Sequence, residues 1–202
     1  TIGLIILCLA FGFINPTFYS SRNISNLLRQ IAPILIIGFG QSYVLITGNI
    51  DLSIGSVVGM SCMISATLMT KGISPFMAVI ITLLVCILTG VINGVLVSGI
   101  KIPPFIATLG TMTVARGVAQ IVNNNYNTDA IGEAAKGFRD LFYYGKFLGL
   151  YNGVWIAIVL FIILAIVLGK TKFGRHIYAV GRNEEAAKFS GINVVTVTTG
   201  VY

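Results

Sequence analysis

The stretch LITGNIDLSIGS, residues 45–56, places a carboxylate among hydroxyl and amide side chains between two segments apolar enough to be membrane helices. Its acid, Asp51, is costly next to hydrocarbon unless hydrogen bonds or water surround it. One interpretation is that Asp51 or Ser53 caps the amides of a following helix, after Gly48 has ended the preceding one. The other is that an acid at this depth marks a solute pathway or a contact with a partner. The two interpretations are compatible.

Asn93 is a second polar residue in apolar surroundings. It lies between Gly90 and Gly94, and such small-xxx-small pairs let helix backbones approach closely. Gly55 and Gly59 form another pair of this kind. A buried amide needs a polar partner, so we expect Asn93 to form an interhelical hydrogen bond. A role in a polar pore is the alternative.

The segment KIPPFIATLGTMTVARG, residues 101–117, combines a double proline with hydroxyl groups and an arginine. The prolines stop any preceding helix and can start a new one at Phe105. That helix would carry Thr108, Thr111 and Arg116. An arginine this far into a membrane helix needs a carboxylate, carbonyl groups or water, so the pattern predicts a helix that lines a polar cavity. Alternatively, the helix ends early and Arg116 lies at the membrane interface.

The remaining reactive residues form no arrangement typical of catalysis or metal binding. The three cysteines lie inside apolar segments, without CxxC spacing or a nearby histidine. The single histidine, His176, allows no proton relay. Residues 169–171 match only the end of a phosphate-binding loop, because Leu164 occupies the position of its first glycine. We therefore expect no catalytic residue, no metal site and no cofactor.

The composition places these polar residues in a membrane protein. Of the 202 residues, 56% are hydrophobic and 9% are charged, whereas a typical soluble domain is about 25% charged. The net charge of +7 comes from basic residues between apolar segments, which indicates lipid head groups and not nucleic acid. A crossing needs about 20 apolar residues. Candidate segments, the first of them short, span residues 1–14, 31–47, 53–69, 76–97, 105–122 and 153–168.

We expect a single transmembrane domain over residues 1–202 that is truncated at both ends. Thr1 enters an apolar run directly, and residues 196–202 have the pattern of the first turns of a further helix. Within the second apolar segment, we expect Pro33 in the first helical turn, where its missing N–H matters little.

Charge and segment order predict the orientation. The dense positive charge of residues 170–195 indicates a cytoplasmic loop. Counting back along the segments makes residues 123–152 external and residues 99–104 and 48–52 internal. The aromatic residues of the external stretch suit a membrane interface. If residues 105–122 re-entered the membrane instead of crossing it, the charge balance would favour this orientation more strongly.

Residues 181–194, GRNEEAAKFSGINV, predict a short surface helix. Asn183 can cap its start, acidic residues follow in its first turn, and Gly191 can end it. Such a helix is either a solvated surface or a docking site for a cytoplasmic partner, and the residue pattern leaves both open.

Three longer stretches are GNIDLSIGS, NGVLVSGIKIPPFIATLGTMTVARG and TKFGRHIYAVGRNEEAAKFSGINV. Together they resemble the permease subunits of bacterial ATP-binding cassette importers for ribose, galactose, arabinose and xylose, a group that includes autoinducer permeases. The likeness runs from about residue 41 to residue 194. It implies an all-α, vitamin B12-importer-like fold in the bacterial inner membrane, with about six of about ten spans present in this chain.

The resemblance also implies partners and roles. A second permease copy, identical or not, would share one path, with cytoplasmic ATP-binding subunits below and an extracytoplasmic sugar-binding receptor above. The permease itself would not be an enzyme. The helix that couples to the ATPase would contain Arg182, Asn183, Glu184, Glu185, Ala186, Ala187, Phe189 and Gly191. The translocation path or its gate would contain Asp51, Asn93, Thr108, Thr111 and Arg116. The hydroxyl and amide groups of Asn93, Thr108 and Thr111 suit loose, multi-point hydrogen bonding to a sugar.

Two other functions compete with this interpretation. An ion-driven carrier predicts inverted repeats and charged residues deep in several helices, and only Asp51 and Arg116 are candidates. A channel or scaffold subunit predicts a repeated filter pattern, which the sequence does not show. The residues do not rank ribose above galactose or an autoinducer.

Overall fold

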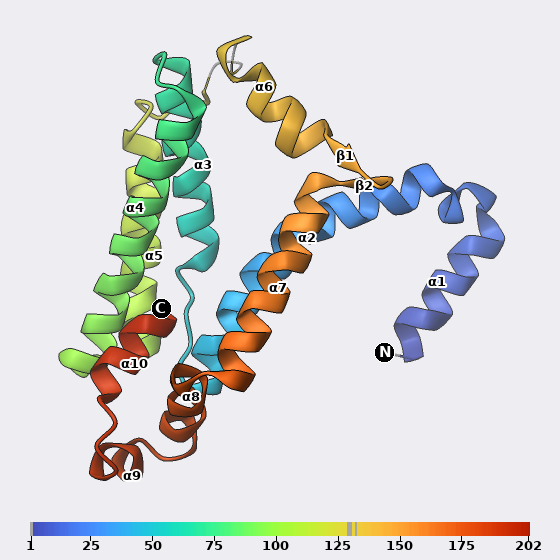
Figure 1. Cartoon of the computed structure of the whole chain (residues 1–202). Coiled ribbons are helices and arrows are strands. Elements are labelled where there is room, and N and C mark those ends of the chain that lie inside the picture. Colours follow the sequence, from blue (N-terminus) through green and yellow to red (C-terminus); the bar gives the residue numbers. More distant parts are fainter. Residues whose placement is uncertain (1, 129–130, 132) are drawn as a thin grey trace.

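The computed structural model describes residues 2–128, 131 and 133–202 as two groups of helices that meet at one end (Figure 1). The first group contains α3 (Ile54–Thr70), α4 (Pro75–Gly94), the π-helix η2 (Val95–Gly99) that extends α4, and α5 (Pro104–Ile121). The second contains α2 (Ser21–Ile46), α7 (Asn152–Lys170) and α8 (Lys172–Arg182). The short helices α9 (Glu184–Phe189) and α10 (Val194–Val201) join the groups, and α10 packs on α4 and η2.

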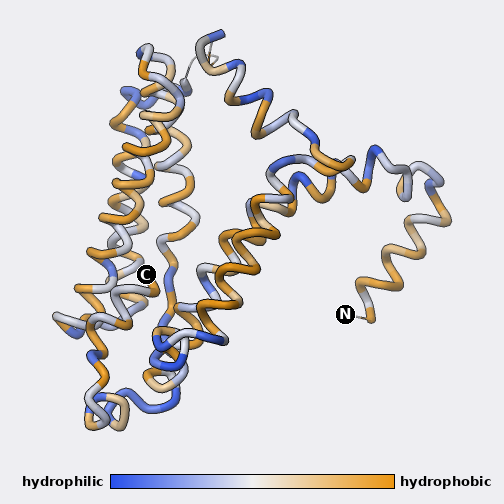
Figure 2. Tube along the Cα trace, in the orientation of Figure 1, coloured by the Kyte–Doolittle hydropathy of each residue, from blue (hydrophilic) through white to orange (hydrophobic). Residues whose placement is uncertain are grey.

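Helix α1 (Ile2–Ile14) lies apart from both groups, and the 3-10 helix η1 (Pro16–Tyr19) connects it to the start of α2 (Figure 1). The Tyr19 hydroxyl donates to the carbonyl of Cys8 at 2.8 Å, which folds η1 back on α1. Helix α1 has no residue buried in the described chain. Figure 2 shows apolar residues along α1, α4 and α7, and polar residues gathered around α8 and α9. A helix that is apolar all round is typical of a lipid-exposed span.

Apart from residue 1, which lies outside the described residues, and a few residues at their ends, the six predicted apolar segments fall on helices. Three helices in the described part of the chain are long and apolar enough to cross a membrane, namely Ser21–Ile46, Pro75–Gly99 and Asn152–Lys170. The helices α1 and α3 are apolar but shorter. The α5 helix runs without a break from Pro104 to Ile121 but is not one of these three helices, so both the crossing and the re-entrant interpretation of this segment stay predictions. Six crossings remain a prediction.

The predicted position of Pro33 in a first helical turn is wrong. The helix α2 begins at Ser21, so Pro33 lies in its interior. The Ser20 side chain caps α2 by accepting a hydrogen bond from the amide of Asn23 at 3.3 Å. The polar run that follows is therefore already helical, and Pro33 removes one i→i−4 hydrogen bond from inside the helix.

The predicted external stretch contains short elements. These are η3 (Glu133–Ala135), α6 (Lys136–Arg139), the π-helix η4 (Asp140–Tyr144), and the antiparallel strands β1 (Lys146–Phe147) and β2 (Leu150–Tyr151). The two-residue strands are the departure from the predicted all-α fold. The guanidinium of Arg29 in α2 lies 4.6 Å from the ring centroid of Tyr143 and 4.8 Å from that of Tyr151. These cation–π contacts fasten the external stretch to the second helix group.

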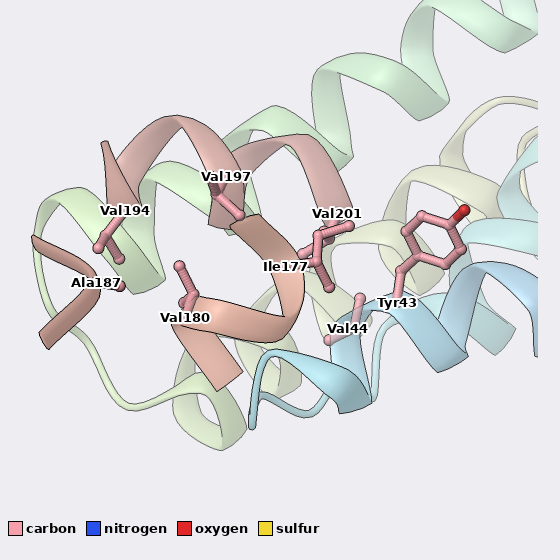
Figure 3. Close-up of a cluster of buried hydrophobic side chains, with 8 residues drawn as sticks. All are labelled: Tyr43, Val44, Ile177, Val180, Ala187, Val194, Val197 and Val201. Carbon is pink, nitrogen blue, oxygen red and sulfur yellow. The ribbon is translucent and has the colours of Figure 1, made fainter. Parts of the chain in front are cut away.

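A buried apolar cluster forms where the two groups meet (Figure 3). Its members are Tyr43, Val44, Ile177, Val180, Ala187, Val194, Val197 and Val201. Close backbone contact at this point requires a glycine, because a Cβ on Gly181 would collide with the carbonyl of Ile46. The cluster holds α8, α9 and α10 against the end of α2.

Candidate functional site

The turn between α2 and α3 forms as the sequence predicts. Gly48 has a φ of +79°, and its amide donates to the carbonyl of Leu45 at 3.0 Å. The amide of Asn49 donates to the carbonyl of Val44 at 3.2 Å, and its side chain donates to the Thr47 hydroxyl at 2.9 Å. A glycine in this left-handed conformation ends α2 and leads into an ordered polar turn.

Asp51 accepts two hydrogen bonds from Ser53 through one carboxylate oxygen. Its Oδ1 lies 2.7 Å from the Ser53 amide nitrogen and 2.6 Å from the Ser53 hydroxyl oxygen. The expected cap of α3 does not form: Asp51 binds the amide of Ser53, which precedes the helix, and Ser53 itself forms no side-chain cap hydrogen bond. The Gln41 side chain donates to the carbonyl of Asp51 at 3.3 Å, which ties this turn back to α2.

A chain of hydrogen bonds continues from Ser53 across α4 to α5. The Asn93 Nδ2 donates to the Ser53 hydroxyl at 3.0 Å, and the Thr111 hydroxyl donates to the Asn93 Oδ1 at 2.5 Å. Ser53 and Asn93 are each 1% exposed. The predicted interhelical hydrogen bond of Asn93 is confirmed. We call Asp51, Ser53, Asn93 and Thr111 the polar chain.

Thr108 and Arg116 lie outside the polar chain. Thr108 is fully buried, and its hydroxyl donates to the carbonyl of Pro104 in the same helix at 2.8 Å. Arg116 lies well inside α5, which continues to Ile121, so the alternative in which the helix ends early is wrong. Because successive residues turn by about 100° around a helix, Arg116 and Thr111 point to different faces of α5.

Arg116 lines a cavity of about 300 Å³ between α3 and α5, which we call the Arg116 cavity. Its other lining residues are Leu52, Gly55, Ser56, Gly59, Met112 and Ala119. No atom from elsewhere in the described chain lies within 4 Å of where a Cβ on Gly55 or Gly59 would stand. None of the salt bridges among the described residues involves Arg116. The cavity therefore presents a cation and an open pair of small residues.

The predicted surface helix is α9. The Asn183 side chain caps it by accepting from the amide of Ala186 at 2.9 Å, and Gly191, with a φ of +80°, follows its end. Ala187 is buried in the apolar cluster, so it fixes the helix inside the chain and is not free to meet a partner. The other residues assigned to coupling are exposed. Phe189 is 92% exposed, a large apolar side chain presented to the surroundings.

Comparisons with known proteins identify the family of this chain. The family described as "Branched-chain amino acid transport system / permease component" matches residues 23–202. The chain belongs to this permease family. Its membership and its apolar helices together show a membrane protein.

Several relatives of the permease are named as sugar importers. The ribose import permease protein of Bacillus subtilis is 40% identical over 201 residues, which cover 100% of this chain and 62% of the relative. The ribose import permease protein of Haemophilus influenzae is 37% identical over 202 residues, with 100% and 62% covered. The galactose/methyl galactoside import permease protein of Escherichia coli K12 is 34% identical over 206 residues, with 95% and 61% covered. The permease chain thus spans less than two thirds of these relatives. No solved structure matches it.

Two residues of the permease matter more than the sequence indicated. Ser53 was a candidate cap, but its hydroxyl joins Asp51 to Asn93. The Asp-x-Ser spacing is typical of such a local turn and is the signal that could have found it. Lys101 forms an ion pair with Glu184 that no local pattern indicated.

Among the described residues, no group of three or more histidine, cysteine, aspartate or glutamate side chains gathers into a metal site.

Proposed function

We propose that this permease chain belongs to the membrane-spanning subunit of an ATP-binding cassette importer that carries a small, ribose-like sugar into the bacterial cytoplasm. The names of the relatives, which are import permeases for ribose, fructose and galactose, support this proposal. ATP hydrolysis would belong to a separate cytoplasmic subunit, and a receptor outside the membrane would select the sugar. A second permease copy would complete the path.

The exposed helix α9 is the observation that carries the proposal. It is anchored from one side by Ala187 and presents Phe189 with 92% of its surface exposed. An exposed aromatic on an anchored helix is typical of a residue that fills a partner's pocket. In the proposed complex, Phe189 packs in a cleft of the ATPase and Glu185 faces basic groups there, whereas Glu184 is already paired with Lys101.

The proposed solute path runs along the Arg116 cavity. An arginine within a membrane helix requires water or polar contacts, and this cavity is where the described chain leaves Arg116 accessible. The polar chain supports the path from behind, because its hydrogen bonds fix α3, α4 and α5 relative to one another. Asp51, Asn93 and Thr111 thus shape the path, and Thr108 braces the start of α5.

Purification of the full-length protein from its native membrane, followed by mass spectrometry, tests the proposal. We expect an ATPase subunit to accompany the wild type and to be lost or strongly reduced in Phe189→Ala. Phe76→Ala is the matched control. Phe76 is 74% exposed, like Phe189 a large exposed aromatic, but it lies at the start of α4, the end of that helix away from α10. The proposal fails if the protein is isolated alone and still drives sugar uptake in ATP-free vesicles, which would indicate an ion-driven carrier.

A further inference from the structure

The side chains of Lys101 and Glu184 connect two segments that are far apart in sequence. The Lys101 Nζ lies 2.5 Å from the Glu184 Oε1. Lys101 stands in the loop between η2 and α5, and Glu184 is the first residue of α9. The two side chains are 60% and 55% exposed, so the ion pair is in contact with water. Exposed pairs of this kind are weak and easily exchanged for another partner.

The backbone of Lys101 is held in an unfavourable conformation. Its φ is +67°, in the left-handed region that favours glycine, yet the residue is a lysine. The loop is fixed on both sides, since the amide of Ile102 donates to the carbonyl of Leu96 at 3.0 Å and Pro103 follows. A glycine at this position would relieve the strain but would lack the ammonium group. The presence of a lysine at this position is therefore explained by its ammonium group and not by its backbone preference.

The ion pair stands where the three segments predicted to be internal come together. They surround a polar cavity of about 200 Å³. Thr47 and Asn49 from the α2–α3 turn, Ser98 from η2, and Lys101 and Glu184 all line it. The same α2–α3 turn continues into the polar chain at Asp51. Helix α9 thus lies next to both the start of α5 and the turn that leads to the polar chain, so a movement of α9 takes place beside both.

We propose that the Lys101–Glu184 ion pair is a coupling latch that transmits movement of the docking helix α9 to α5. Lys101 precedes the first residue of α5, Pro104, by a short, rigid connection through Pro103. Helix α5 in turn carries Thr111 of the polar chain and Arg116 of the cavity. When an ATPase displaces α9, Glu184 pulls on Lys101 and so on the end of α5. Lys101 and Glu184 are positioning residues, since neither lines the Arg116 cavity. The latch rests on the proposed function, because it presupposes a partner that moves α9.

Charge reversal in the full-length permease, reconstituted in vesicles with its ATPase, tests the latch. Sugar uptake and ATP hydrolysis are measured together, and the readout is uptake per ATP hydrolysed. Loss of an exposed pair should lower this ratio by about two- to fivefold in Lys101→Glu and in Glu184→Lys. The double exchange, Lys101→Glu with Glu184→Lys, should restore most of it. Lys172→Glu, an exposed charge reversal in α8 outside the pair, should leave the ratio unchanged.

Lys101→Gly separates coupling from folding. It relieves the left-handed strain at this position, so we expect membrane levels at or above those of the wild type together with the same loss of coupling. A wild type that shows no ATP-driven uptake would overturn the proposed function, and the latch with it. A coupled wild type whose ratio is unchanged in Lys101→Gly, or is not restored in the double exchange, would overturn the latch alone.

Discussion

The polar chain and the Arg116 cavity share helix α5 but differ in how their polar groups are satisfied. In the polar chain, Ser53 and Asn93 are buried, and each of the four side chains forms a hydrogen bond with another member of the chain. In the cavity, Arg116 is exposed and forms none of the salt bridges among the described residues. A satisfied buried network fixes helices in place, whereas an unpaired cation in a membrane helix needs water or solute. Helix α5 therefore takes part in a brace on one face and lines a cavity on another.

The two small-residue pairs show the same division. A Cβ on Gly94 would collide with the Cα of Thr199, and one on Gly90 would collide with the carbonyl of Tyr202, so α4 meets α10 there almost backbone to backbone. The pair Gly55 and Gly59 has open space beside it. The same sequence pattern thus packs a helix in one place and leaves room in another.

The largest effect is expected where the closed pair is filled. Gly94→Val places a branched side chain against the backbone of Thr199, so we expect a loss of at least about 3 kcal/mol of stability, or no folded protein. Gly59→Val, the matched change in the open pair, should cost less than about 1 kcal/mol. Thermal unfolding of the full-length protein in detergent measures both.

Transport then sharpens the contrast between the two glycine variants. Gly59→Val fills part of the Arg116 cavity, so we expect sugar uptake to fall while the protein stays folded. Equal losses of stability in Gly94→Val and Gly59→Val would show that the open pair is packed in the full-length protein. The distinction between closed and open faces would then be lost.

Asn93→Leu should give the next largest effect. It removes the amide that joins Ser53 to Thr111. The loss of these two hydrogen bonds should cost about 1–2 kcal/mol, because the Ser53 hydroxyl keeps Asp51 and the Thr111 hydroxyl keeps the Ala107 carbonyl as partners. Arg116→Met is the comparison variant, a change of similar size in an exposed side chain, and should alter stability by less than about 0.5 kcal/mol. The two variants should affect different measurements. Asn93→Leu should mainly lower stability, measured by unfolding in detergent, and Arg116→Met should mainly lower sugar uptake in vesicles.

The opposite pattern would contradict this assignment. If Asn93→Leu leaves stability unchanged and abolishes uptake, Asn93 contacts the solute. If Arg116→Met prevents membrane insertion, the role of Arg116 is structural.

The helices were predictable because long apolar runs permit few alternatives in a membrane, where backbone groups must be satisfied within the segment. The hydrogen bonding of Asn93 was predictable in kind, since a buried amide needs a partner. Its identity was not, because Ser53 and Thr111 meet it only through helix packing. In the same way, Gly48 predicted the turn that ends α2, but the sequence did not show that Asp51 would bind the Ser53 amide before α3 instead of capping the helix itself.

The predictions failed where polar residues occupy helices. The interior position of Pro33 was missed because the polar run before it has no apolar signal, although Ser20 caps a helix there. Helix α8 was missed because its basic residues dominate its composition. Its apolar face, with Gly174, Ile177 and Val180 buried at helical spacing, becomes clear only against the cluster it packs on.

The smallest expected effect concerns single hydroxyl groups on α5. Thr111→Val removes the donor to Asn93 and should cost about 1 kcal/mol, since one interhelical hydrogen bond in a membrane protein contributes about that much. Thr113→Val is the control, because the Thr113 hydroxyl is exposed and donates only to the carbonyl of Leu109 in its own helix at 3.0 Å. That change should cost less than about 0.5 kcal/mol.

Uptake measured over a range of sugar concentrations decides what the difference between the two threonines means. If the polar chain is a brace, Thr111→Val weakens the protein against heat but leaves the sugar concentration at half-maximal uptake unchanged. A rise in that concentration, with stability unaltered, would place the Thr111 hydroxyl in the path itself. The solute would then pass between α4 and α5, and the Arg116 cavity on the other face of α5 would have a separate use.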